Sequence, residues 1–261
     1  MRASKREDNT DYWEYVLLYV DDCLCISTHP EKIIREEIGK YFLMKETSIG
    51  TPDIYLGGKV SQVELETGEI CWSFSSSQYV QEACQNVRKY LQDRYKDDRA
   101  VQNRQYFMPK KAGAPLSNNY RPEIDVSSEL EPVDAAYYQS LIGILRWMVE
   151  LGRIDICVEV LMMSSCLALP REGHLMQVFH MFSYLEKNHN SEMVFDHSVP
   201  DIEHNDFPKQ DWSNTVYANE RGELKEEVPS NFPPSYGKEF VMRVFVDSDH
   251  AGDQVLSLIH I

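Results

Sequence analysis

The sequence predicts an α+β fold, with strands in its first 75 residues and mainly helices over residues 76–195. Short apolar runs separated by turn residues occur at 15–26 and again at 54–74, a pattern typical of hairpins. Beyond them, apolar residues recur every three or four positions, which is the spacing of amphipathic helices. A further short β-pattern begins near Phe240.

Composition limits the class of protein. The chain has 261 residues, of which 43% are hydrophobic, enough for the core of one or two domains. It contains no apolar run long enough to cross a bilayer and no signal-peptide pattern. Its six cysteines form no C-x-x-C pair. We therefore expect an intracellular, cytoplasmic protein with reduced thiols and without membrane contact.

The formal net charge of −16 argues against a nucleic-acid partner, since such proteins usually carry basic surface. The charge is uneven, however. Residues 88–111 hold eight basic and three acidic residues, a local balance of +5, with four aromatic residues among them, whereas residues 196–239 are acidic. The net charge weakens a nucleic-acid function without excluding it.

Asp21 and Asp22 separate the two apolar runs of the first predicted hairpin, so we expect both carboxylates at its tip. Two-residue turns favour Asn-Gly or Asp-Gly, because both positions need positive φ. Adjacent like charges repel, and a divalent cation offsets that repulsion. The pair therefore suits a two-metal phosphoryl-transfer site. A solvated acidic turn is the alternative interpretation.

After this hairpin, His29-Pro30 predicts a helix start, because proline suits the first helical position. Ile34, Ile38 and Phe42 then repeat at helical spacing, with Ile33 and Tyr41 beside them. The pattern predicts an amphipathic helix that packs on a sheet.

The second predicted hairpin runs from Ile54 through Leu65, turns at residues 66–69 and returns over residues 70–74. Gly57-Gly58 within it indicates a strand bulge or a close approach of the backbone to a neighbour.

A helix is expected over residues 75–91, with a possible capping box from Ser75 to Gln78. Its apolar stripe consists of Tyr79, Ala83, Val87 and Leu91. The basic segment beyond it is either a solvated helix end or a nucleic-acid contact. A loop over residues 109–132 follows.

Three further helices are predicted. Asp134 can cap the first and Gly152 suits its end, whereas Asp155 can cap the second, which is apolar on nearly all sides up to Pro170 and is expected to be buried. The apolar stripes of the first and third helices are Tyr138, Leu141, Leu145 and Met148, and Leu175, Phe179, Phe182 and Leu185.

Three histidines and an acidic cluster near the end of the sequence are candidate metal ligands. No two of His174, His180 and His189 lie one helical turn apart, so packed or solvated histidines are expected. The segment 247–253 has the form Asp-x-Asp-x-x-Gly, but an EF-hand loop would need different residues at Ala251 and Leu258. An EF-hand is therefore rejected.

The motif Tyr19-Val20-Asp21-Asp22, with its apolar flanks, resembles the catalytic hairpin of reverse transcriptases. Residues 138–143, 152–156, 170–174 and 184–185 resemble the connection segment of the copia-type retrotransposon branch, although most members have proline where this chain has Ile154. The resemblance is to a copia-type retrotransposon polyprotein and covers residues 13–195 and 240–253.

This resemblance implies a division of the chain into five parts. Residues 1–12 are a linker or truncated upstream region, and residues 13–75 are a partial palm with the catalytic hairpin and a primer-grip-like hairpin. Residues 76–195 are thumb and connection helices, residues 196–239 an acidic linker or insertion, and residues 240–261 the truncated start of an RNase H domain.

The resemblance also implies roles for single residues. Asp21 and Asp22 are the expected catalytic, metal-binding carboxylates of the polymerase, and Asp247 that of RNase H. The residues expected to contact primer or other nucleic acid are Tyr19, Leu56, Gly57, Gly58, Arg88 and Lys89.

The implied activity is RNA-directed DNA polymerase with RNase H, using Mg²⁺, an RNA or DNA template–primer and deoxynucleoside triphosphates, within the remainder of the polyprotein and, in the family, in virus-like particles. A further upstream aspartate and most of RNase H are missing from the sequence, so we expect the isolated chain to be inactive. Residues 255–261 no longer follow the family pattern.

Two alternatives remain open at this point. The chain could be a non-catalytic nucleic-acid-binding or scaffold remnant, or a divalent-cation-binding module built on residues 247–253.

Overall fold

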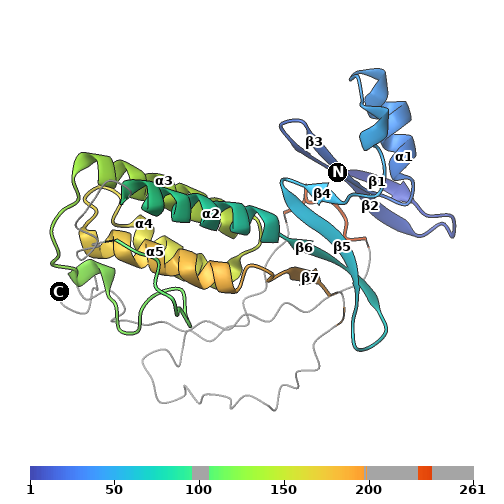
Figure 1. Cartoon of the computed structure of the whole chain (residues 1–261). Coiled ribbons are helices and arrows are strands. Elements are labelled where there is room, and N and C mark those ends of the chain that lie inside the picture. Colours follow the sequence, from blue (N-terminus) through green and yellow to red (C-terminus); the bar gives the residue numbers. More distant parts are fainter. Residues whose placement is uncertain (96–105, 197, 199–228, 237–261) are drawn as a thin grey trace, which may run out of the picture. The chain divides into compact units, whose positions relative to one another are not determined.

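The computed structural model describes residues 1–95, 106–196, 198 and 229–236 (Figure 1). It is mixed α and β with two antiparallel sheets. By their contacts, the described residues divide into two compact units. The first unit holds residues 1–17, 25–46 and 229–236, and the second holds residues 18–24, 47–95 and 106–196.

The first sheet has the order β1-β2-β3, with β1 at Arg2–Lys5, β2 at Asp11–Tyr19 and β3 at Asp22–Ile26. β1 and β2 are antiparallel, with Arg2 opposite Glu14. Residues 1–12, predicted as a linker or truncated upstream region, thus contain β1 and the start of β2.

The segment after β3 is helical but not as predicted. It consists of α1 (Pro30–Lys32), the π-helix η1 (Ile33–Glu37) and the 3₁₀-helix η2 (Ile38–Lys40). Pro30 is the first helical residue, as expected. The predicted stripe is confirmed only in part: Ile33 beside it is buried and Ile34 and Ile38 are partly buried, but Phe42 is 67% exposed. A π-turn adds a residue to the helical repeat, and this shifts which side chains share a face.

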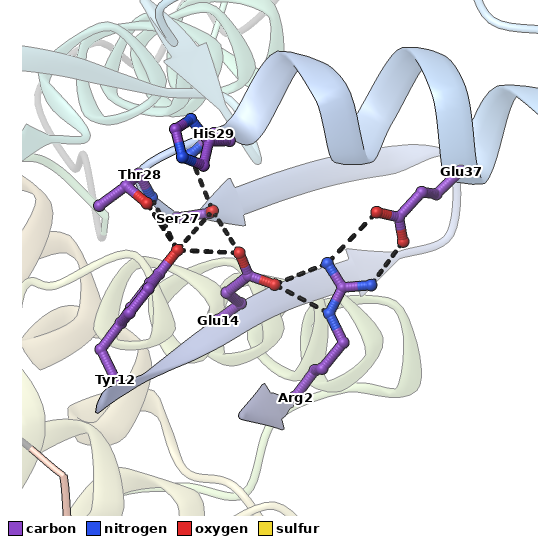
Figure 2. A network of polar contacts seen from close by, with 7 residues as sticks. All are labelled: Arg2, Tyr12, Glu14, Ser27, Thr28, His29 and Glu37. Carbon is purple, nitrogen blue, oxygen red and sulfur yellow. Dashed lines mark hydrogen bonds and ion pairs between the residues drawn. The ribbon is translucent and has the colours of Figure 1, made fainter. Parts of the chain in front are cut away.

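The first unit is cross-linked by a polar network around the buried carboxylate of Glu14 (Figure 2). The guanidinium of Arg2 donates to Glu14 Oε2 through Nε (2.8 Å) and Nη2 (2.6 Å), and to Glu37 Oε2 through Nη1 (2.6 Å). The hydroxyls of Tyr12 (2.9 Å) and Ser27 (2.8 Å) donate to Glu14 Oε1. The network therefore fastens β1, β2, η1 and the segment after β3 to one another.

The second sheet has the order β4-β5-β6-β7, with β4 at Ile54–Tyr55, β5 at Gly58–Glu64, β6 at Ile70–Ser75 and β7 at Met193–Phe195. All neighbouring strands are antiparallel. The predicted turn at residues 66–69 is confirmed, with Gly68 at a positive φ of 82°. The short 3₁₀-helix η3 (Glu46–Ser48) precedes this sheet.

Helices make up the rest of the second unit: α2 (Ser77–Arg94), α3 (Pro132–Glu150), α4 (Cys157–Ser164) and α5 (Glu172–Lys187), with the 3₁₀-helices η4 (Pro122–Ile124) and η5 (Ile154–Ile156). α2, α3 and α5 contact one another (Figure 1). The predicted stripes of α3 and α5 are confirmed, since all their members are at most 1% exposed. In α2, Val80 is buried and Tyr79 only partly so.

Two predicted helix caps were wrong. Ser75 is paired with Lys59 in the sheet, so it cannot open α2, and Ser76 is the N-cap without a side-chain capping bond. Asp134 is the third residue of α3, and its carboxylate pairs with the guanidinium of Arg94, with Nη2 at 2.8 Å from Oδ2. The side chain of Asp134 is thus taken by a tertiary contact, whereas the backbone of Ser75 is held in the strand while its hydroxyl accepts from the N–H of Ser77 at 3.4 Å.

The predicted end of α3 at Gly152 is confirmed. Gly152 has a φ of +89°, its N–H donates to the carbonyl of Val149, and the N–H of Arg153 donates to that of Met148. This is a Schellman motif, which needs a left-handed residue after the helix and therefore favours glycine.

The prediction for the second of the three helices was wrong in three respects: where the helix ends, which residue caps it and how far it is buried. α4 ends at Ser164, and its exposed side includes Val158 (65%) and Leu161 (62%). Asp155 does not cap it, because the carboxylate binds the buried guanidinium of Arg153 at 2.8 and 2.7 Å. Neutralising this buried cation takes precedence over capping a short helix.

Among the described residues, none of the helices has both the length and the apolar character that crossing a bilayer requires.

Substitutions at two glycines, Gly58 in β5 and Gly143 in α3, test how closely the second sheet is packed. A Cβ at Gly58 would lie 2.1 Å from Cζ of Phe74, whereas a Cβ at the exposed, helical Gly143 meets nothing within 4 Å. We expect Gly58→Ala to lower the free energy of unfolding by about 1–3 kcal/mol through overpacking. Gly143→Ala should raise it by about 0.5–1 kcal/mol. Urea titration measures both, and equal effects would contradict the close packing.

The Glu14 network predicts an acid-dependent stability. Burial raises the pKa of Glu14, but hydrogen bonds from Arg2, Ser27 and Tyr12 outweigh it and lower the pKa from 4.5 to about 2. Because the folded pKa is the lower one, the stabilisation is present above pH 4.5 and is lost as the pH falls towards 2.

We expect Glu14→Gln to cost about 1–3 kcal/mol of unfolding free energy at neutral pH, since it breaks charge-assisted hydrogen bonds. It should also flatten the acid limb of a stability-against-pH curve between pH 4.5 and 2. Glu64→Gln, an exposed change on β5, is the control that should leave this limb unchanged.

Candidate functional site

The carboxylates of Asp21 and Asp22 lie at a hairpin tip that differs by one residue from the prediction. Val20 and Asp21 form the two-residue turn, and Asp22 is the first residue of β3. Only Val20 has a positive φ, of 54°. A positive φ at the first turn position alone is typical of type II′ turns, which normally place glycine there. A β-branched residue in this conformation is strained.

Both aspartates of the tip are exposed. Within the described part of the chain, neither carboxylate takes part in a side-chain hydrogen bond or an ion pair. They therefore retain their oxygen lone pairs for a ligand, and two adjacent carboxylates are the type of donor that Mg²⁺ prefers.

Residues 18–24 group with the second unit, and two contacts there involve the tip. The ring of Tyr19 lies 6.0 Å from that of Trp147 on α3, centroid to centroid. Burial raises the pKa of Tyr55 on β4, and the negative charge of Asp22 raises it further. The predicted catalytic tip thus lies near the strand that precedes the predicted primer-grip turn.

That second turn consists of Leu56 and Gly57, between β4 and β5. Both have positive φ, 52° and 80°, as a type I′ hairpin turn requires. Gly58 is buried beneath the ring of Phe74. The prediction of a close approach to the backbone is thus confirmed at Gly58, which lies against Phe74. Gly57 instead provides the positive φ of the turn.

The two predicted cations on α2 differ in their surroundings. The guanidinium of Arg88 forms a two-point ion pair with the carboxylate of Glu186 on α5, and hydrogen bonding from Arg88 lowers the pKa of that carboxyl. Lys89 is exposed and, among the described residues, makes no ion pair. Lys89 is therefore the freer of the two to meet an anion.

The C-terminal half of α2 borders a pocket of about 390 Å³. Its walls come from residues 88–95, at and just beyond the end of α2, and from residues 106–108, and they combine aromatic, aliphatic and polar side chains. The lining residues are Arg88, Leu91, Gln92, Tyr95, Tyr106, Phe107 and Met108. The only signal of this pocket in the sequence is indirect: aromatic residues are interleaved with the basic segment.

The predicted histidine environments are confirmed. His174 is buried, and its Nδ1 accepts from the N–H of Arg171 at 3.0 Å. His180 contacts the carbonyl of Ala114, and His189 contacts Ser77. In residues 1–95, 106–196 and 229–236, no group of three or more His, Cys, Asp or Glu side chains is placed to hold a metal ion.

Asp247 and the rest of the predicted RNase H strand lie outside the described residues. Their role stays a prediction. Sequence reasoning missed Tyr55 as a neighbour of Asp22 and Trp147 as a neighbour of Tyr19, because nothing in the spacing of these residues indicates proximity.

Comparison with known proteins gives one informative similarity. The chain is 28% identical over 173 residues to the Saccharomyces cerevisiae protein named "Putative transposon Ty5-1 protein YCL074W". The match covers 66% of this chain and 48% of that protein, so the chain spans about half the length of the curated relative it matches. This similarity indicates a retrotransposon-related protein. No protein-family model matches the chain, and no solved structure matches it.

The strained turn residue gives a testable prediction. Val20 and Val126 are both 93% exposed, but of the two only Val20 has a positive φ. Asparagine tolerates the left-handed region better than a β-branched residue. We expect Val20→Asn to raise the free energy of unfolding by about 0.5–1 kcal/mol, and Val126→Asn to leave it nearly unchanged. Denaturant titration distinguishes them, and a destabilised Val20→Asn would contradict the turn conformation.

Proposed function

We propose that this chain is part of a retrotransposon reverse transcriptase, in which Asp21 and Asp22 are two of the metal-binding carboxylates of the polymerase centre. The observation that carries the proposal is the β2–β3 hairpin, whose strained turn presents both aspartates to solvent with no side-chain partner among the described residues. Strained backbone concentrates at functional sites, because a stability cost there must be offset by function.

Other acidic residues of the chain have partners that the two aspartates of the tip lack. The carboxylates of Glu14, Asp134 and Asp155 each bind an arginine and serve the fold. Within the part of the chain that the structure describes, the carboxylates of Asp21 and Asp22 bind no arginine. Held side by side, they would repel each other unless a cation lay between or beside them.

Mg²⁺ fits this donor set, since it binds through one or two carboxylates and completes its octahedron with water and substrate phosphates. Bound there, it would supply charge neutralisation for the attacking and leaving oxygens of nucleotidyl transfer. The chain's own contribution is to fix the two carboxylates at the end of a short, paired turn and to keep them exposed to substrate.

Two further features support a nucleic-acid substrate. In the tight Leu56–Gly57 turn, Gly57 is exposed and has no side chain, so a primer strand could approach its backbone closely. Lys89 on α2 carries an exposed charge without an ion-pair partner in the described residues. Together they provide backbone contact and phosphate neutralisation on the unit that also contains the aspartate tip.

Binding of Mn²⁺ tests the metal site without requiring activity. Mn²⁺ replaces Mg²⁺ at oxygen sites and broadens the NMR signals of nearby nuclei. We expect amide signals of residues 19–23 to broaden first, and Asp21→Asn or Asp22→Asn to weaken this effect at least several-fold. Asp53→Asn, a change at an exposed aspartate, is the matched control. Equal broadening in Asp21→Asn and the wild type would contradict the proposal.

Titration of a labelled RNA–DNA hybrid at several salt concentrations tests the substrate class. We expect log Kd to depend linearly on log salt, because phosphate contacts release counterions. Lys89→Ala should lower the magnitude of that slope by about 1, whereas Lys40→Ala, a change at an exposed lysine of η2, should leave it unchanged. Absence of salt-dependent binding would argue against a nucleic-acid function.

A further inference from the structure

We propose that the pocket at the C-terminal half of α2 binds a single unpaired nucleobase of a nucleic-acid strand. This inference rests on the proposed nucleic-acid function and adds a subsite to it. Neither the aspartate tip nor the Leu56–Gly57 turn contributes to the pocket.

The pocket has the size and lining that a planar, partly polar ligand requires. At about 390 Å³ it lies near the lower end of the range of small-ligand sites, about 300–1,000 Å³. Tyr106 is 3% exposed and Leu91 is 9% exposed, so both lie deep in the protein, whereas Phe107 is 48% exposed. A partly exposed aromatic ring above an apolar floor offers a surface on which a base can stack.

The position of the aromatic wall is fixed by hydrogen bonds. The backbone N–H of Tyr106 donates to the hydroxyl of Tyr95 at 2.9 Å, which joins the end of α2 to the returning segment. The guanidinium of Arg94 lies over the ring of Tyr106, 4.9 Å from its centroid, and also pairs with Asp134. The wall is therefore pre-formed, which lowers the entropic cost of binding.

The polar groups of the pocket favour a base over an apolar peptide side chain. Gln92 is exposed, and among the described residues its amide makes no hydrogen bond, so it can both donate to and accept from a base edge. Arg88 also lines the pocket, and the charge of its guanidinium is neutralised by the carboxylate of Glu186. An uncharged ligand with hydrogen-bonding edges matches this lining.

The charges near the pocket match the phosphates that accompany a base in a strand. Lys89 lies three residues before Gln92, on the same side of α2, and Lys110 and Lys111 follow Met108 closely in the chain. All three lysines are exposed, and within the described residues none forms an ion pair. Despite the net charge of −16, the pocket is thus flanked by unneutralised positive charge.

The test compares two labelled single strands of equal length, an oligodeoxyadenylate and its fully abasic counterpart, by fluorescence anisotropy with the full chain. We expect the wild type to bind the strand with bases about 5- to 100-fold more tightly, the range expected for one stacked base. Phe107→Ala should remove most of this difference and Phe107→Tyr should retain it.

Phe195→Ala is the matched control, because Phe195 is similarly exposed (55%) but lies on β7. It should keep the preference for bases. Equal affinity of the wild type for both strands would overturn the inference, as would equal losses in Phe107→Ala and Phe195→Ala.

The result of this test can be distinguished from the results of the tests of the proposed function. Salt-dependent hybrid binding with no preference for bases would overturn the pocket assignment alone. A preference for bases that depends on Phe107, in a chain whose Asp21 and Asp22 fail to bind Mn²⁺, would uphold the pocket and overturn the polymerase assignment.

Discussion

The second unit depends above all on the burial of three apolar helix faces against one another. Phe179 and Phe182 of α5, Tyr138 of α3 and Val80 of α2 are completely buried in one cluster. Burial of such side chains contributes about 1.5–3 kcal/mol each, and no polar contact in the unit approaches their sum. The pocket walls and the sheet are positioned by this core, because α2 supplies side chains to the core and the pocket alike.

Ion pairs then fix how the buried helices lie. Arg88 of α2 binds Glu186 of α5, and Arg94 of α2 binds Asp134 of α3. The rings of Tyr90 and Tyr137 stack between α2 and α3 at 3.7 Å. These contacts are directional, whereas apolar burial is not, so they select one arrangement among those that the core alone would permit.

Six acidic residues of this chain differ in whether an arginine neutralises them. Glu14, Asp134, Asp155 and Glu186 are neutralised by arginines, and the hydrogen bonds that they accept stabilise the fold. The adjacent aspartates of the β2–β3 hairpin have no such partners among the described residues. Their placement on a strained turn is a cost to the fold, which is the reason to assign them a function.

The hairpins, the stripes of α3 and α5 and the glycine at the end of α3 could be predicted from the sequence, because periodicity and positive φ are local properties. The helix caps, the buried face of the π-helical segment and the neighbours of Asp22 depend on contacts between distant segments and could not be predicted. Ser75 illustrates the reason: a serine that could cap a helix is instead held in a strand by its pairing with Lys59. The pocket follows the same rule, since it forms only where the side chains of residues 88–95 and of residues 106–108 lie together. Local sequence fixes what each segment can form, whereas contacts between distant segments decide which of those possibilities has the lowest free energy.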